Sequence, residues 1–515
     1  MTSPLSGWKL PKVAFALYLG QGTKSPAAGP ASILVVGPRA YDSTGGSGHE
    51  LGSAADNEIK QVGGLDDAKT YWGGGSPIAR VVAAIFAEHP SATVYGVCPA
   101  TGVGATRGSW TVQITGTATA SGTLKYAVAD DLYEVSVASG DTNDTVGAAL
   151  AAAITANENA PVWASYNSTT DTLTLTAKFY GPESAGITPV LVQAVGGITV
   201  GSPSATAGTI EPDWASAYGA VDAWGLVPAY IVPCCNDTTV LTSGATSLKA
   251  YITGWLAPLS GKLITAVIGW TAAADPTTAL DAWDNGTTNY DEPGYWSQMI
   301  IAPSAPAEPW RVAGHGIGAR AAGEDSGGAN SNWIGLTGCT LNMVMPWSSS
   351  AAYSLSAANT FVRTGGSPVW WDFAGSKARL MQSVCCKHLL GSSQSDAVVE
   401  STNVPSVCRV VSYGIRDMIY TTFSGFRVVE DDTSGEPPDD LPSRCTSPSL
   451  MKEWLLATMQ NKYEVIGYVQ NVRALADVTS VQIDPADAQA LLYELPLDVP
   501  RWLLRVVGTH REVGG

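Results

Sequence analysis

The chain has 515 residues, which is enough for three or four domains of ordinary size. Only 14% of the residues are charged, against about 25% in an ordinary soluble domain, while 45% are hydrophobic. The formal charge of −17, without any cluster of Lys and Arg, excludes a protein that binds a nucleic-acid backbone. The hydrophobic content excludes a disordered chain, and a surface poor in charge suits a subunit that is covered by its neighbours.

Targeting and membrane-spanning segments are not evident in the sequence. Residues 1–7 lack a basic segment followed by an apolar one, and no apolar run approaches the roughly 18 residues that a membrane span needs. The closest run, 78–87, is interrupted by Arg80. We therefore expect a protein that is made and used without secretion or membrane insertion, and without membrane binding in its resting state.

The N-terminal part of the chain predicts an isolated strand followed by an α/β unit. Apolar residues alternate along 12–19, and a loose segment rich in Gly, Ser, Pro and Ala follows as far as 31. A strand so isolated must pair with something distant in the sequence or with another chain. After it we expect a buried strand at 32–37, a helix at 78–88 with Ser76 as its N-cap, and a strand at 94–97.

Residues 101–207 differ in character and predict an inserted module. Ser and Thr abound, and alternating apolar residues predict strands around residues 110–114, 124–128, 133–137, 162–166 and 173–177. A helix capped by 140–144 and running to about 155 separates the third strand from the fourth. We interpret this segment as a compact α+β module with its own core.

From 209 onward the α/β pattern resumes. We expect helices at 213–221, 248–256 and 448–463, and strands at 229–232, 263–268, 478–483, 491–497 and 502–507. Segments 270–300 and 322–360 predict long loops, and 430–440, with six acidic residues, predicts a solvated loop rather than a divalent-ion site.

Catalytic and metal-binding motifs are missing from the sequence. There is no GxSxG, HExxH or GxxxxGK[ST] pattern, and the Gly-His-Gly-Ile-Gly sequence at 314–318 predicts a turn rather than a dinucleotide loop. The eight cysteines show no CxxC spacing and predict buried thiols; the Cys-Cys-Lys-His sequence at 385–388 has no second ligand pair at a zinc-site spacing. We expect structural histidines, no catalytic residues, no cofactor and no metal, and therefore no enzyme.

Tryptophan content leaves an alternative open. Trp283, Trp296, Trp370 and Trp371, with acids nearby, could line the sugar groove of a carbohydrate-active enzyme. The other interpretation is that these side chains anchor the core and subunit interfaces. A surface-lattice or adhesin protein is a further alternative, although such a protein would be expected to show a secretion signal or repeats.

Five segments, taken in order, resemble the contractile tail sheath proteins of phages, and more closely those of Mu-like phages. They are an extended arm leading to a strand (10–37), a Trp-Gly-Gly-Gly-Ser-Pro helix start with the strand after it (72–97), a β-rich insertion (from 116), an Ala-Pro-rich segment with an Ala/Gly-rich stretch (302–323), and a C-terminal helix, strand and arm (from 450). The segment 325–445 departs most from the family.

The resemblance implies a phage structural protein of the viral tail. Such a protein forms hexameric rings that stack helically around an inner tube protein, and the sheath contracts to drive the tube through a cell envelope for genome ejection. It also implies baseplate and tail terminator proteins as partners, assembly in the host cytoplasm, and a place in the virion tail. A tailocin or an injection particle would look the same from this sequence.

The expected fold is therefore an α/β core with an inserted β-rich α+β module and extended N- and C-terminal arms. We divide the chain into an N-terminal arm and linker (1–31), the first part of the core (32–100), the module (101–207), the rest of the core with long loops (208–430), a C-terminal α/β domain near the tube (431–500) and a C-terminal arm (501–515). The module is expected to project from the outer surface.

The two terminal strands are predicted to be inter-subunit arms, because an apolar strand left free at a chain end would aggregate. The alternative is that both strands pair inside their own subunit. The C-terminal helix is expected to bury Leu450, Trp454, Leu455 and Met459 and to turn Lys452 and Lys462 toward the tube, or simply toward solvent. The predicted arm residues are Val13, Phe15, Leu17, Leu19, Trp502, Leu504 and Val506.

Overall fold

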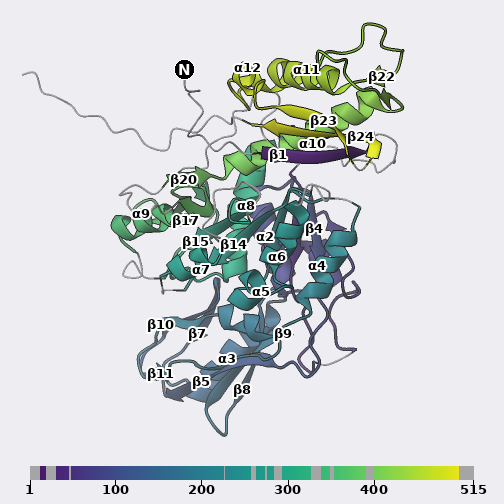
Figure 1. Ribbon diagram of the computed structural model, residues 1–515. Helices are drawn as coiled ribbons and strands as arrows, with labels where there is room; N and C mark the ends of the chain where they lie inside the picture. Colours follow the sequence, from purple (N-terminus) through teal and green to yellow (C-terminus); the bar gives the residue numbers. More distant parts are fainter. Residues whose placement is uncertain are drawn as a thin grey trace, which may run out of the picture. The chain divides into compact units, whose positions relative to one another are not determined.

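The computed structural model describes residues 12–18, 31–45, 48–225, 227–256, 262–272, 275–283, 293–325, 338–347, 353–389, 398–485 and 487–497. It separates into two compact units (Figure 1). Unit 1 comprises Met1–Ala28 and Ser401–Gly515, and unit 2 comprises Gly29–Glu400. Unit 1 thus begins earlier than the predicted C-terminal domain and includes the N-terminal strand. Among the described residues, no helix is both long and apolar enough to cross a bilayer.

Unit 2 is built on a nine-stranded sheet in the order β16-β18-β17-β15-β14-β13-β2-β4-β3. The six strands from β17 to β4 are parallel to one another, and β3, β18 and β16 add to the two edges in antiparallel pairs. The central strands read as continuous apolar runs because both faces of the sheet are covered. The strands are β2 (Ile33–Val36), β3 (Lys60–Val62), β4 (Val94–Val97), β13 (Tyr230–Pro233), β14 (Thr265–Trp270), β15 (Ser297–Ile301), β16 (Cys339–Leu341), β17 (Gly366–Asp372) and β18 (Lys377–Leu380), with β19 (Val384–Leu389) and β20 (Val398–Ser401) outside this sheet.

The expected start of helix α2 (Pro77–Glu88) is confirmed. The helix begins where the sequence predicts, with the Ala79 N–H donating to the Ser76 Oγ at 3.2 Å. The other helices between β2 and β20, apart from α3, are α1 (Leu65–Trp72), α4 (Trp214–Ala223), α5 (Thr238–Thr242), α6 (Leu248–Leu256), α7 (Thr277–Asp281), α8 (Pro309–Asp325) and α9 (Leu355–Arg363).

The turn predicted at 314–318 is wrong, because these residues lie inside α8. Small residues here serve close packing: a Cβ on Gly314 would lie 3.1 Å from the Ala84 Cβ, and one on Gly318 would lie 2.9 Å from the Glu88 Cβ. The glycines therefore let α8 approach α2 closely. The loops predicted at 270–300 and 322–360 are also wrong in part, since α7, β15, β16 and α9 lie within them.

Residues between β4 and β13 form sheets of their own. One has the order β10-β6-β7, and the other has the order β11-β5-β9-β8 with β12 also paired to β5. Helix α3 buries Val146, Leu150 and Ile154, which recur every four residues along one face. Figure 1 shows these elements together at one end of unit 2. They are β5 (Arg107–Gly116), β6 (Gly122–Val128), β7 (Asp131–Val137), α3 (Asn143–Ala156), β8 (Val162–Asn167), β9 (Thr172–Tyr180), the 3-10 helix η1 (Pro182–Gly186), β10 (Pro189–Gln193), β11 (Ile198–Val200) and β12 (Ser204–Thr206).

Unit 1 contains a three-stranded antiparallel sheet in the order β1-β24-β23, which we call the terminal sheet. The strand predicted at 502–507 lies outside the described residues. The elements of unit 1 are β1 (Lys12–Tyr18), α10 (Asn403–Phe423), β21 (Arg427–Val428), β22 (Cys445–Thr446), α11 (Pro448–Thr458), the π-helical turn η3 (Met459–Glu464), α12 (Val472–Leu475), β23 (Ser480–Asp484) and β24 (Asp487–Pro496).

Candidate assembly surfaces and the joint of the inserted module

The terminal sheet joins the two ends of the chain. Strand β1 runs antiparallel to β24, with Lys12 opposite Pro496 and Tyr18 opposite Ala490. This pairing lies within one chain, in agreement with the alternative prediction that the N-terminal strand pairs inside its own subunit. Because β1 is the outermost strand, its other edge has no strand partner among the described residues. An open edge of this kind presents backbone N–H and C=O groups to a further strand.

The predicted arm residues are only partly described. Val13, Phe15 and Leu17 lie on β1, while Leu19, Trp502, Leu504 and Val506 lie outside the described residues. The pairing of Lys12 with Pro496 means that both chain ends leave from the same end of the terminal sheet. Their role as inter-subunit arms stays a prediction.

The C-terminal helix buries a face close to the predicted one. Leu455 and Met459 are fully buried, whereas Leu450 and Trp454 are only half-buried. The Trp454 ring packs edge-to-face on Phe423 with ring centroids 5.2 Å apart. The sequence reasoning missed Met451, which lies four residues before Leu455 and is also buried.

Both candidate tube-facing lysines lie off this buried face. Lys452 is half-buried, Lys462 is exposed, and neither forms an ion pair with a described residue. Two positive charges on a chain of net charge −17 are therefore available to an acidic partner.

The acidic segment 430–440 is a structured exposed loop. Asp432 accepts N–H bonds from Ser434 at 2.8 Å and Glu436 at 2.9 Å, and these bonds hold the pKa of Asp432 below its usual value. Asp431 accepts the Ser449 Oγ–H at 2.6 Å and so fastens the loop to the start of α11. The exposed acids are thus presented on a defined turn, as a second charged surface of unit 1.

A buried charge cluster joins the module to the core of unit 2. Arg80 of α2 lies 2.7 Å from Asp130 and 2.7 Å from Asp131, at the turn between β6 and β7, and 2.6 Å from Glu308 just before α8. Arg80 also donates to the Asn159 carbonyl at 2.9 Å. Arg311 adds a second cation beside Asp130. The module is therefore tied to the core by ion pairs, not only by its two connecting segments.

Burial and the neighbouring charges shift the pKa values of Arg80 and Glu308. Burial alone would lower the pKa of Arg80, but the charges of Glu308, Asp131 and Asp130 outweigh it and hold that pKa well above its usual value. Burial also raises the pKa of Glu308 in spite of Arg80. The only trace of the joint in the sequence is Arg80 interrupting an apolar run, because its acidic partners lie 50 to 228 residues away.

Three of the four tryptophans of the sugar-groove alternative are buried. Trp283, Trp296 and Trp371 are buried, and half-buried Trp370 packs against Tyr353. Asp284 lies outside the described residues. These four rings do not line an open groove in the part of the chain that the structure describes.

The described histidine side chains all pair with carboxylates. His315 and Glu88 are both buried, with Nδ1 2.7 Å from Oε1, and His89 lies 2.9 Å from Asp325. Both pairs connect α2 to α8. They occupy positions in helix packing, as the sequence reasoning expected for structural histidines.

Comparison with known proteins identifies a partial relative. No family model matches the chain. Over 130 residues, 25% of the chain, it is 35% identical to the Mu-like prophage FluMu tail sheath protein of Haemophilus influenzae, and the aligned segment spans 26% of that relative. A crystal structure of a sheath tail protein from Listeria innocua matches with 11% identity and a TM-score of 0.43, over 93% of this chain and 94% of that one. The resemblance to a Mu-like tail sheath protein is confirmed over the aligned segment.

Proposed function

We propose that this chain is the protomer of a contractile tail sheath, forming hexameric rings that stack helically around an inner tube and contract to drive the tube through a cell envelope. The observation that carries the proposal is the 35% identity over 130 residues to a tail sheath protein. In this proposal the chain is a non-enzymatic part of a virion tail that assembles in the host cytoplasm.

The terminal sheet supports a mode of assembly. A neighbouring subunit's strand can add to the open edge of β1 through main-chain hydrogen bonds, with little demand on side chains. Because both chain ends leave from the same end of this sheet, arms extending from it would reach the same neighbourhood. Interfaces that repeat along an axis without closing produce a stacked assembly rather than a finite oligomer.

The surfaces of unit 1 supply candidate contacts with the tube. Lys452 and Lys462 would face an acidic patch of the tube protein, and the loop 430–440 would face a basic one. Baseplate and tail terminator proteins would cap the two ends of the stack.

Electron microscopy of the purified protein tests the proposal. The full chain is expected to form striated tubes, whereas variants lacking residues 1–20, or everything after Pro500, are expected to be soluble and unable to form tubes. Lys125→Ala, which removes an exposed ion pair with Glu134 in the module, is a control that should assemble normally. Flat sheets from the full chain would favour a lattice protein, and single particles would favour the enzyme alternative. Normal tubes from both truncated proteins would show that the ends are not the links.

A further inference from the structure

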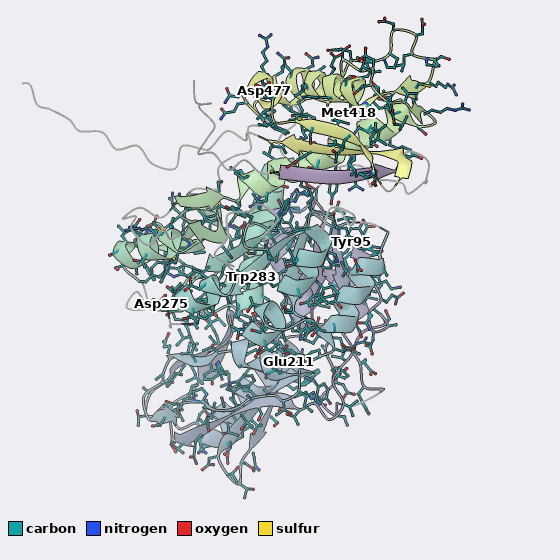
Figure 2. The ribbon with its side chains drawn as sticks, in the orientation of Figure 1. Tyr95, Glu211, Asp275, Trp283, Met418 and Asp477 are labelled. Atoms are coloured by element: carbon teal, nitrogen blue, oxygen red, sulfur yellow. The ribbon has the colours of Figure 1, made fainter. Side chains whose placement is uncertain are left out.

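Three potential ligands converge in unit 2 where the chain leaves the module and re-enters the core. Glu183 lies in η1 after β9, Glu211 lies just before α4, and Cys235 follows β13. One ligand atom from each lies within 4.8 Å of the others. Glu183 and Cys235 are each 1% exposed, and Glu211, labelled in Figure 2, is half-buried.

Glu183 is the unusual member of this group. Neither of its buried carboxylate oxygens accepts a hydrogen bond from a donor in the described part of the chain, and its carboxyl lies against that of Glu211. The chain makes room for this carboxylate at Gly181, which has φ +109° and where a Cβ would collide with the Glu183 Oε2. A buried acid left in this way is destabilising unless a proton or a cation neutralises it.

Protein cations do not provide the neutralisation. Within the described part of the chain, no Lys, Arg or His forms an ion pair with Glu183 or Glu211, and the other charged group that acts on Glu183 is the acidic Asp237. The Arg80 joint shows the contrast, because buried Glu308 there has an arginine 2.6 Å away. The three side chains therefore form an uncompensated anionic group if all are ionised.

The neighbours of the cluster orient its other two members. The Trp214 Nε1–H donates to the Glu211 Oε2 at 3.0 Å, and the Asp237 N–H donates to the Cys235 Sγ at 3.3 Å. Donors of this kind fix the direction of ligand atoms around metal sites. Glu211 is half-buried, unlike the other two members of the group.

We propose that Glu183, Glu211 and Cys235 form a binding site for one zinc-like divalent cation. A thiolate with two carboxylates selects zinc or cobalt over magnesium or calcium, which prefer oxygen ligands alone. A bound zinc would need zinc–sulfur bonds of about 2.3 Å and zinc–oxygen bonds of about 2.0–2.2 Å, so the three ligand atoms, now within 4.8 Å of one another, would have to converge on it. Three protein ligands would leave a fourth position of a tetrahedral zinc to water.

Burial acts on two members of the cluster. Burial, with the contact to Glu211, raises the pKa of Glu183 well above its usual value, and burial raises that of Cys235 as well. The bound ion would link the exit of the module to strand β13 of the core sheet.

The test uses the full chain, freed of metal by chelation and kept reduced, and titrated with Co²⁺ as a spectroscopic probe for zinc. We expect one Co²⁺ per chain with a sulfur-to-cobalt charge-transfer band, displaced by Zn²⁺, and a higher melting temperature with Zn²⁺. Cys235→Ser should abolish the band, and Glu183→Gln should weaken Co²⁺ binding at least about tenfold. Cys234→Ser is the matched control, because Cys234 is the adjacent buried thiol and lies outside the cluster.

The outcomes separate cleanly. A band retained in Cys234→Ser and lost in Cys235→Ser supports the site. If a variant fails to fold, the unsubstituted chain is tested alone. Absence of the band, together with absence of bound zinc by mass spectrometry, overturns the proposal, and Glu183 and Glu211 are then a carboxyl pair that shares a proton. A band that survives in folded Cys235→Ser overturns it too. Neither result depends on tube formation, so the site and the sheath function fail separately.

Discussion

Arg80 provides a test of how the module is held to the core. We consider Arg80→Met, which keeps most of the apolar stem and removes the charge. The substitution leaves Glu308, 1% exposed at its side chain, without the cation 2.6 Å away, and it removes both ion pairs to the β6–β7 turn. Arg311 continues to neutralise Asp130, so Glu308 carries most of the uncompensated charge.

The expected magnitude follows from that burial. Removing one partner of a buried ion pair destabilises a protein by about 3–5 kcal/mol. The matched control is Lys125→Met, because Lys125 and Glu134 of the same module form an exposed pair, with side chains 32% and 51% accessible. Pairs of that kind contribute about 0–1 kcal/mol.

Urea unfolding followed by tryptophan fluorescence measures both variants. Trp310, buried beside Phe179 of the module with ring centroids 6.2 Å apart, lies close to the joint and reports on it. Adding Glu308→Gln to Arg80→Met should recover part of the loss, because it removes the stranded charge. If the urea midpoint of Arg80→Met differs from that of the unsubstituted protein by no more than the midpoint of Lys125→Met does, this account of the joint is refuted.

Three further predictions concern pH, the tube and the module. Burial lowers the pKa of Lys178 to about 8, whereas a lysine in the unfolded chain has a pKa near 10.4, so the cost of burying the charge disappears as the pH rises from about 8 to 10.4. The stability of the unsubstituted protein relative to Lys178→Met should therefore rise over this range, and a stability difference that stays flat would contradict the prediction. Changing Lys452 and Lys462 together to Glu should weaken tube attachment in co-sedimentation at low salt more than at high salt, and unchanged attachment at low salt would count against the contact. Replacing 101–207 by a short linker, with Arg80 kept because Glu308 of the core remains its partner, should still give striated tubes; complete loss of soluble protein would show that the module is needed for folding.

Local pattern was enough to predict several central strands of the core and the first five strands of the module. Continuous apolar runs predicted the parallel strands β2, β4 and β13, and alternation predicted β5 to β9 of the module but not β10, β11 and β12, because the side-chain period of a strand is visible only where the strand is long enough. The Ser76 cap is equally local, since its hydroxyl needs only an N–H three residues away. The order of such elements was also enough for the resemblance to tail sheath proteins.

Tertiary packing decided what those patterns could not. Residues 314–318 have low helix propensity but are helical, because only small residues let α8 approach α2. Arg80 appeared in the sequence as a break in an apolar run, yet it is the buried cation that three distant acids share. Glu183 gave no signal at all. A helix cap or a strand period is set by neighbours in sequence, whereas the charge state of a buried group is set by whichever distant segments the fold brings against it.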